Sequence, residues 1–133
     1  MGKRVLVVDD EDEVREFVSA VLEENDYTPL IARNGKEAME IIRQDRPDLI
    51  IMDILMPMQG GIMMYRGLKT NDSFKDIPVI IYSGIGKRTF LRTQEARTEF
   101  GEQRVPPPEA YIEKPAKAEK LETAIEDILG QTN

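Results

Sequence analysis

Five polar side chains follow or end short apolar runs of the sequence, at points where strands would end. Asp9 and Asp10 follow "VLVV", Asp53 follows "LIIM", Ser83 ends "PVIIYS" and Lys114 follows "AYIE". In a parallel sheet these side chains would meet at one edge, because ligands of such sheets bind outside the carboxyl ends of the strands. Three carboxylates in one cleft repel one another unless a cation compensates their charge. The pattern therefore predicts a cation site at that edge.

Mg²⁺ is the cation that fits this set best, because it is bound by oxygen atoms and accepts one or two carboxylates together with a phosphate. A metal ion and a lysine would both offset negative charge on a transferring phosphoryl group. One of the carboxylates could then attack a phosphoryl donor. The product of that reaction would be an aspartyl phosphate.

A purely structural interpretation accounts for part of the acidic run. Acids in the first turn of a helix complement its dipole, which explains Glu11, Asp12 and Glu13. It explains Asp9 and Asp10 less well, because these two directly end an apolar run. A lone hydroxyl or lysine at a strand end would be structural or solvated, and gains weight only by sharing the edge with the acids.

The stretch "YSGIGKRT" contains a Gly-Lys pair but does not make a phosphate-binding P-loop. A P-loop needs a glycine five positions before the glycine of the pair, and Ser or Thr directly after the lysine. Ile81 and Arg88 occupy these two positions. The glycines are better interpreted as a flexible exit from a strand.

The composition limits the remaining chemistry. The chain has 133 residues, which fits one domain. It contains no cysteine and no histidine, which excludes disulfides, thiolate metal sites and Ser-His or Cys-His hydrolases. Its net charge of −7 argues against unaided binding of nucleic acid. No apolar run is long enough for a membrane span or a signal peptide, so we expect a cytoplasmic protein with no membrane partner.

The pattern of apolar residues predicts strands that alternate with helices. The strands are short and rich in Val and Ile, which is typical of a buried parallel sheet. They are expected at residues 3–9, 27–32, 48–53, 77–83 and 110–113. The helices are expected at about residues 11–25, 34–44, 61–70, 86–100 and 117–129.

Local signals support these elements. Apolar residues of the first expected helix recur at helical spacing, so one face is apolar. Asn34 and Glu37 form a capping-box arrangement at the start of the second. Pro29 cannot donate to a strand ladder, which places its strand at the edge of the sheet. The triple proline at 106–108 forbids a regular element and marks a rigid connector.

The alternation of strands and helices implies right-handed crossovers and an α/β fold. We expect a doubly wound, five-stranded parallel sheet of the flavodoxin-like kind, with strand order 2-1-3-4-5 and helices on both faces. One domain is expected over residues 1–133, with an extended fourth helix and connector at about 84–109. No output domain is recognisable after the last helix.

Four blocks, "VLVVDDEDEV", "DLIIMDILMPMQGG", "PVIIYSG" and "AYIEKP", occur in this order over nearly the whole chain. In that order they resemble the motifs of the receiver domains of two-component response regulators, of the single-domain, chemotaxis-regulator-like kind. Each block alone would be a weak signal, but together they are highly specific.

The resemblance implies a role for each acidic residue. Asp53 matches the phosphoacceptor of the family. Asp9 and Asp10 match the acidic pair that binds Mg²⁺ together with it. The backbone carbonyl of Leu55 would be a further metal ligand.

The resemblance also implies residues that sense the phosphoryl group. Ser83 matches the hydroxyl that contacts this group, and Lys114 matches the lysine that bridges to it. Pro115 would follow a cis peptide bond. Tyr111 matches the aromatic residue whose inward or outward rotamer reports phosphorylation, although taken alone it would be interpreted as a half-buried strand residue.

Partners and a mode of action follow from the same resemblance. A sensor histidine kinase or phosphotransfer protein would donate the phosphoryl group. A downstream protein would bind the face formed by the fourth helix, the fifth strand and the fifth helix. The domain would act as a conformational switch and not as an enzyme, although it would assist its own phosphorylation and dephosphorylation. Direct binding of nucleic acid is not expected.

The chain departs from the family's pattern between Ser83 and Lys114. Their separation is 114 − 83 = 31 residues, about two helical turns more than usual. Residues 87–104 hold five basic and three acidic residues, a local charge of 5 − 3 = +2 in a chain of −7. This stretch is either a solvated helix face or a partner-docking feature. Gly84 stands where the family often has alanine, which predicts a mobile loop and looser coupling to the phosphate.

Three other functions fit parts of the pattern. A Mg²⁺-dependent phosphohydrolase of the haloacid-dehalogenase type also forms an aspartyl phosphate, but it needs a second acid two residues after the nucleophile, where Leu55 stands. A flavodoxin-like electron carrier needs a hydroxyl-rich phosphate loop after the first strand, where this chain is acidic. A receiver-like interaction module that works without phosphorylation is opposed only by the intact acids.

Overall fold

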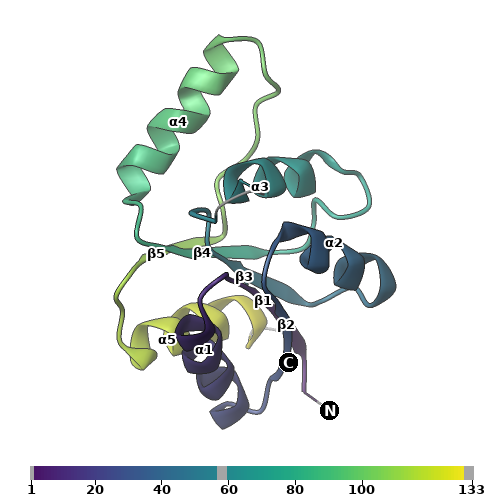
Figure 1. Cartoon of the computed structure of the whole chain (residues 1–133), viewed down its shortest axis with the longest axis vertical. Helices are drawn as coiled ribbons and strands as arrows, with labels where there is room; N and C mark the ends of the chain where they lie inside the picture. The colour runs from purple at the N-terminus through teal and green to yellow at the C-terminus, as the bar shows by residue number, and fades with distance from the viewer. Residues whose placement is uncertain (1, 57–59, 131–133) are drawn as a thin grey trace.

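In the computed structural model, which describes residues 2–56 and 60–130, a five-stranded parallel sheet lies between helices (Figure 1). The strand order is β2-β1-β3-β4-β5, so the expected fold class and order are confirmed. The elements are β1 (Arg4–Val8), α1 (Asp12–Glu24), β2 (Thr28–Ala32), α2 (Gly35–Gln44), β3 (Leu49–Met52), α3 (Gly61–Thr70), β4 (Val79–Ser83), α4 (Lys87–Glu99), β5 (Ala110–Glu113) and α5 (Ala118–Leu129).

The register of the sheet explains the burial of its strands. β1 pairs with both β2 and β3, and β3 pairs in turn with β4, so these strands have neighbours on both edges, and helices cover both faces of the sheet. Every residue of β3 and of β4 is buried. Pro29 lies on β2 and pairs with Val5 of β1, and β2 is an edge strand, as its proline predicts.

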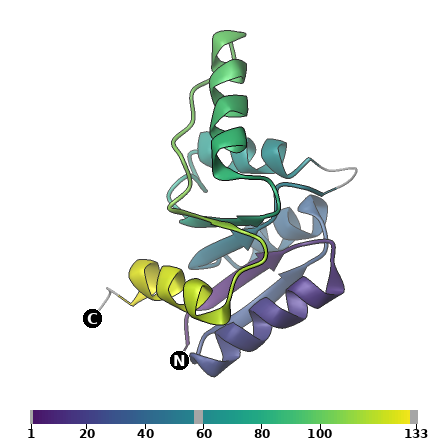
Figure 2. The same cartoon turned by 90° about the vertical axis from the view of Figure 1, so that its left-hand side faces the viewer.

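Two apolar cores lie on opposite faces of the sheet. On one face, Val5 and Val7 of β1 pack with apolar residues of α1 and α5. On the other, Leu6 and Val8 pack with residues of α2, α3 and α4. Figures 1 and 2 show α1 and α5 on one side of the sheet and α2 and α3 on the other. The helices thus fix the strands from both sides and leave the carboxyl edge of the sheet open for side chains.

The start of α2 is capped much as the sequence predicts. Asn34 Oδ1 accepts a hydrogen bond from the amide of Glu37 at 2.9 Å. The Glu37 side chain, however, accepts from the amide of Arg33 at 2.9 Å, one residue before the cap. Its carboxylate also pairs with the Arg33 guanidinium at 2.9 Å, which holds it there.

The fourth helix differs from the others in how it meets the sheet. Figures 1 and 2 show α4 extending away from the sheet, with the chain after it returning alongside. Of its residues only Phe90 is buried. The Phe90 ring lies 5.6 Å from the ring of Tyr65 on α3 and 5.6 Å from that of Tyr111 on β5. This ring is therefore the buried side chain through which α4 packs on the body of the domain.

Residues 100–109, the connector from α4 to β5, contain no helix or strand and are held by α3. The Tyr65 hydroxyl donates to the carbonyl of Pro106 at 2.6 Å. The buried Arg66 guanidinium forms an ion pair with Glu102 and donates to the Gln103 carbonyl. α4 and the connector together make up most of the chain between β4 and β5.

None of the helices in the described part of the chain is both long and apolar enough to cross a membrane.

Replacing Phe90 by alanine is expected to lower the free energy of unfolding by about 3–5 kcal/mol, the usual cost of removing a buried phenyl ring. The measurement is urea-induced unfolding followed by circular dichroism. The control is Phe100→Ala just after the same helix, where the residue is 88% exposed and the expected change is within about 0.5 kcal/mol. An equal loss of unfolding free energy in the two variants would show that Phe90 does not anchor α4.

Candidate functional site

The acidic residues stand directly on the ends of two neighbouring strands. The amide of Asp9 donates to the carbonyl of Ala32 at 3.2 Å, and the amide of Asp53 donates to that of Val8 at 3.0 Å. The backbone of both residues is thus fixed by the sheet, while their side chains leave it at the carboxyl edge. Asp9 is 2% exposed and Asp53 4% exposed, so both carboxylates are largely removed from water.

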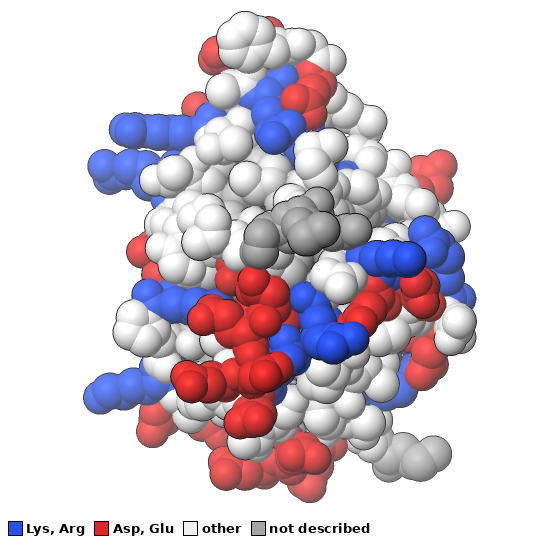
Figure 3. Space-filling model, viewed as in Figure 1, with Lys and Arg blue, Asp and Glu red and all other residues white. Residues whose placement is uncertain are grey.

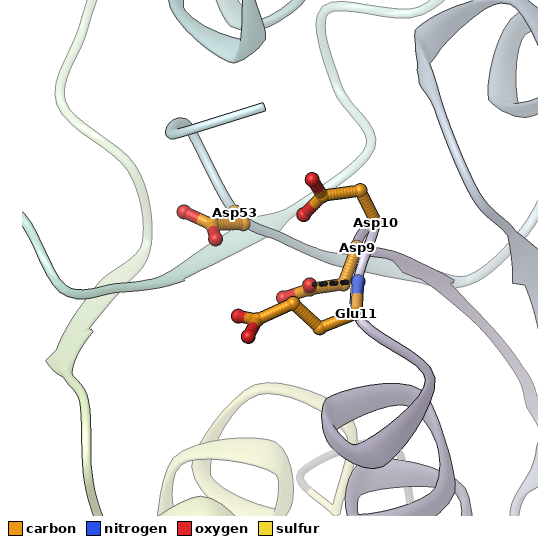
Figure 4. Close-up of side chains that lie close together, drawn as sticks. All are labelled: Asp9, Asp10, Glu11 and Asp53. Atoms are coloured by element: carbon orange, nitrogen blue, oxygen red, sulfur yellow. Dashed lines mark hydrogen bonds between the residues drawn. The ribbon is translucent and has the colours of Figure 1, made fainter. Parts of the chain in front are cut away.

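Four carboxylates gather at this edge. Asp9, Asp10, Glu11 and Asp53 each offer an oxygen within 4.8 Å of the others. Figure 4 shows their side chains around one common space, with the amide of Glu11 bonded to Asp9. Asp10 and Glu11 are exposed, so the cluster opens to solvent on that side. Figure 3 shows acidic side chains grouped on the face of the molecule that is seen there.

Lys114, directly after β5, neutralises part of this charge. Its Nζ lies 2.9 Å from Asp9 Oδ2 and 3.0 Å from Asp53 Oδ2, and 3.6 Å from Glu11. Its backbone amide donates to the carbonyl of Ser83 at 2.8 Å, which fixes the lysine at the end of β4. One ammonium group thus bridges the ends of β1 and β3.

Burial and charge act in opposite directions on these groups. Burial raises the pKa of Asp9, and hydrogen bonds from Lys114 and from the amide of Glu11 offset that rise in part. Burial lowers the pKa of Lys114, but its hydrogen bonds to Asp9 and Asp53 outweigh this, so the pKa is raised overall. Lys114 therefore stays protonated at neutral pH.

The donor set fits a hard divalent cation. It consists entirely of carboxylate oxygens, two from buried and two from exposed side chains, and it carries more negative charge than one lysine neutralises. A cation such as Mg²⁺, which retains waters and takes few carboxylates, suits a cluster that opens to solvent. Leu55 lies beside this set, since its amide donates to Asp53 Oδ1 at 2.8 Å.

The remaining predicted residues lie on β4 and β5 and in the peptide bond after Lys114. Ser83 is fully buried at the end of β4, and its hydroxyl accepts a hydrogen bond from the amide of Ile85 at 3.3 Å. Tyr111 on β5 donates its hydroxyl proton to the Ile85 carbonyl at 2.6 Å. Burial, with help from the charges of Glu113 and Asp53, raises the pKa of Tyr111 to about 12, so the hydroxyl remains a donor at neutral pH. The Lys114–Pro115 peptide bond is cis.

Three residues near the site were not singled out from the sequence. Glu11 was attributed to the helix dipole but belongs to the carboxylate cluster. Arg15, one helical turn further along, donates to the Asp9 carbonyl at 2.7 Å. Gly61 packs on the strand end itself: a Cβ there would lie 2.6 Å from the carbonyl oxygen of Asp53, so only glycine fits. The Gly-Gly pair after the acidic strand was the available signal for this close approach.

Comparisons with known proteins agree with this geometry. The family model of the response regulator receiver domain matches residues 5–126. The polar-differentiation response regulator DivK of Brucella anthropi is 32% identical over 130 residues, covering 98% of each chain. The phosphate regulon transcriptional regulatory protein PhoB of Escherichia coli is 32% identical over 129 residues. The chain spans only about half of the length of such relatives: the match covers 52% of PhoB and 52% of the response regulator MprA of Mycobacterium ulcerans.

Solved structures show the same likeness. The receiver domain of a signal transduction histidine kinase from Syntrophus aciditrophicus has a TM-score of 0.82 at 30% identity, covering 99% of this chain and 93% of that one. The chemotaxis response regulator CheY4 of Vibrio cholerae has a TM-score of 0.80 at 24% identity, covering 97% and 100%, and shares the fold. With the family match over most of its length, the chain belongs to the response regulator receiver domains of two-component signalling.

Proposed function

We propose that this receiver domain is phosphorylated on Asp53 with the help of Mg²⁺ and acts as a conformational switch. The observation that supports this most strongly is the bridge of Lys114 Nζ to Asp9 and Asp53, at 2.9 and 3.0 Å, inside a cluster of four carboxylates. A lysine and a metal-binding acidic set around one buried carboxylate are what transfer of a phosphoryl group to that carboxylate requires.

In the proposed reaction, an Asp53 carboxylate oxygen attacks the phosphorus of a phosphohistidine on a sensor histidine kinase or a phosphotransfer protein. A P–O bond forms to Asp53 and the P–N bond to the histidine breaks, with its electron pair remaining on the imidazole. This chain has no histidine of its own, so the donor must lie on another protein or in a small phosphodonor.

The surrounding residues have distinct tasks in this proposal. Asp9 and Asp10, with Asp53 and the Leu55 carbonyl, would hold Mg²⁺, which supplies positive charge opposite the transferring oxygens when bound. Lys114, which contacts the carboxylates of Asp9 and Asp53, would exchange one of these two hydrogen bonds for a hydrogen bond to an oxygen of the new phosphoryl group. The domain assists the gain and the loss of its own phosphoryl group but acts on no separate substrate.

The switch would run through β4 and β5. Ser83 would turn its hydroxyl toward the phosphoryl group. It would then lose the hydrogen bond that its hydroxyl accepts from the Ile85 amide at 3.3 Å. Tyr111, whose hydroxyl bonds to the Ile85 carbonyl and whose ring contacts Phe90, would move with that loop. Since Phe90 anchors α4, the face formed by α4, β5 and α5 would change, and a downstream protein partner would read that face.

Incubation with acetyl phosphate and Mg²⁺ is expected to add the mass of one phosphoryl group to the wild type. Asp53→Asn should gain none, because the nucleophilic carboxylate is gone. Intact-protein mass spectrometry measures both, with metal removed by chelation as a control that should also abolish the gain. No gain in the wild type would contradict the proposal and favour a receiver that works without phosphorylation.

Two single substitutions are expected to change Mg²⁺ affinity in opposite directions, as measured by titration calorimetry. Asp10→Asn should weaken binding by at least about tenfold, because one carboxylate ligand is lost. Lys114→Met should tighten it several-fold, because an ammonium group 2.9 Å from Asp9 repels a second cation.

Lys117→Met is the matched control, since it removes the same charge from an exposed position outside the cluster. Its effect on Mg²⁺ affinity should stay within about twofold, because water and salt screen a distant charge. Weaker Mg²⁺ binding in Lys114→Met, or unchanged binding in Asp10→Asn, would contradict this assignment of the metal site.

A further inference from the structure

A groove runs between α4 and the end of β5, on the part of the chain that departs from the family pattern. Its volume is about 570 Å³. We call it the α4 groove; it is lined by Lys87, Arg88, Leu91, Arg92, Glu95 and Glu113. The separation of these residues along α4 places them in two adjacent rows, Lys87, Leu91 and Glu95 in one and Arg88 and Arg92 in the other.

The three cations of the α4 groove are unpaired. Lys87, Arg88 and Arg92 are exposed, and none forms an ion pair with a carboxylate among residues 2–56 and 60–130. By comparison, the exposed Arg33 does form an ion pair, with Glu37 four residues later on α2. The α4 groove therefore presents positive charge to solvent in a chain whose net charge is −7.

The placement of these cations also costs helix stability. Lys87 and Arg88 lie in the first turn of α4, which holds no acidic residue, although the helix dipole favours acids there. Arg88 and Arg92 are four residues apart, a spacing at which like charges repel. A sequence selected only for a stable solvated helix would avoid both arrangements, so the cations point to an anionic partner.

The α4 groove also has an apolar element and a fixed wall. Leu91 is partly buried and packs against the core, and the exposed part of its side chain lines the groove in the same row as Lys87 and Glu95. The Glu113 carboxylate accepts from the amide of Lys87 at 3.3 Å, which ties the start of α4 to β5. Figure 3, viewed as Figure 1, shows basic side chains projecting from the edge of the molecule beside α4, apart from the large acidic group on the same face.

We propose that the α4 groove binds an acidic segment of a partner protein, with one apolar side chain of that segment against Leu91. Carboxylates of the segment would pair with Lys87, Arg88 and Arg92, which supply the charge complementarity. Nucleic acid fits less well, because the groove holds three basic and two acidic residues, a charge of 3 − 2 = +1, in an acidic chain. This inference rests on the proposed function, because it assumes that a downstream partner binds the face formed by α4 and β5.

The test is a selection of random displayed peptides on the full chain, at physiological ionic strength. Enriched peptides should carry net negative charge and an apolar residue. Their affinity, measured by fluorescence anisotropy, should fall at least about tenfold for the triple variant Lys87→Glu, Arg88→Glu, Arg92→Glu. The control variant Lys36→Glu, Arg43→Glu, Lys75→Glu has the same change of charge on α2 and the α3–β4 loop and should bind like the wild type.

Enriched peptides without excess acid, no enrichment, or equal binding by the triple variant would overturn the proposal. Binding of duplex DNA that the triple variant loses would also overturn it, in favour of a nucleic-acid surface. The triple variant should still gain a phosphoryl group from acetyl phosphate, because the substituted residues lie outside the carboxylate cluster. If the wild type gains no phosphoryl group, the proposed function is contradicted. The peptide binding result still decides whether the α4 groove binds an acidic segment.

Discussion

The candidate site is organised by the contact between one ammonium group, that of Lys114, and two buried carboxylates, those of Asp9 and Asp53. Taking Asp9 and Asp53 out of water at adjoining strand ends costs several kcal/mol per ion by itself. Lys114 Nζ, at 2.9 and 3.0 Å, offsets that cost only in part, because Asp10 and Glu11 add further charge. Apolar residues would fill the same space with no such penalty. Stability of the fold therefore does not explain why four carboxylates lie together at this edge of the sheet.

The sheet fixes the contact, and the order of its strands explains why residues far apart in sequence meet. β1 and β3 are neighbours, so Asp9 and Asp53 lie side by side, and the amide bond from Lys114 to Ser83 brings β5 into reach. The same strands carry Tyr111, which joins the site to α4 through Phe90. β5 and the residue after it thus carry both the aromatic ring that packs against α4 and the lysine that contacts the buried carboxylates.

The sequence predicted the parts of this arrangement that depend on local pattern. Runs such as "VLVV" and "LIIM" are buried on both faces and so identify central strands, and polar residues at their ends identify the site. Side-chain contacts that involve neither a strand end nor a periodic apolar pattern were not predictable from the sequence. The hold of α3 on the connector through Arg66 and Glu102, 36 residues apart by number, leaves no local pattern. Glu11 was missed because a first-turn acid has an adequate local explanation in the helix dipole.

The central claim is that one carboxylate of the four, Asp53, accepts the phosphoryl group. Its most direct test is to treat the phosphorylated chain with borohydride, which reduces an aspartyl phosphate to homoserine, and to locate the altered residue by tandem mass spectrometry. The account predicts reduction at Asp53 alone, because Asp53 follows β3 and faces both Lys114 and the acids after β1, which are proposed to hold the metal ion. Reduction at Asp9, Asp10 or Glu11 would contradict it.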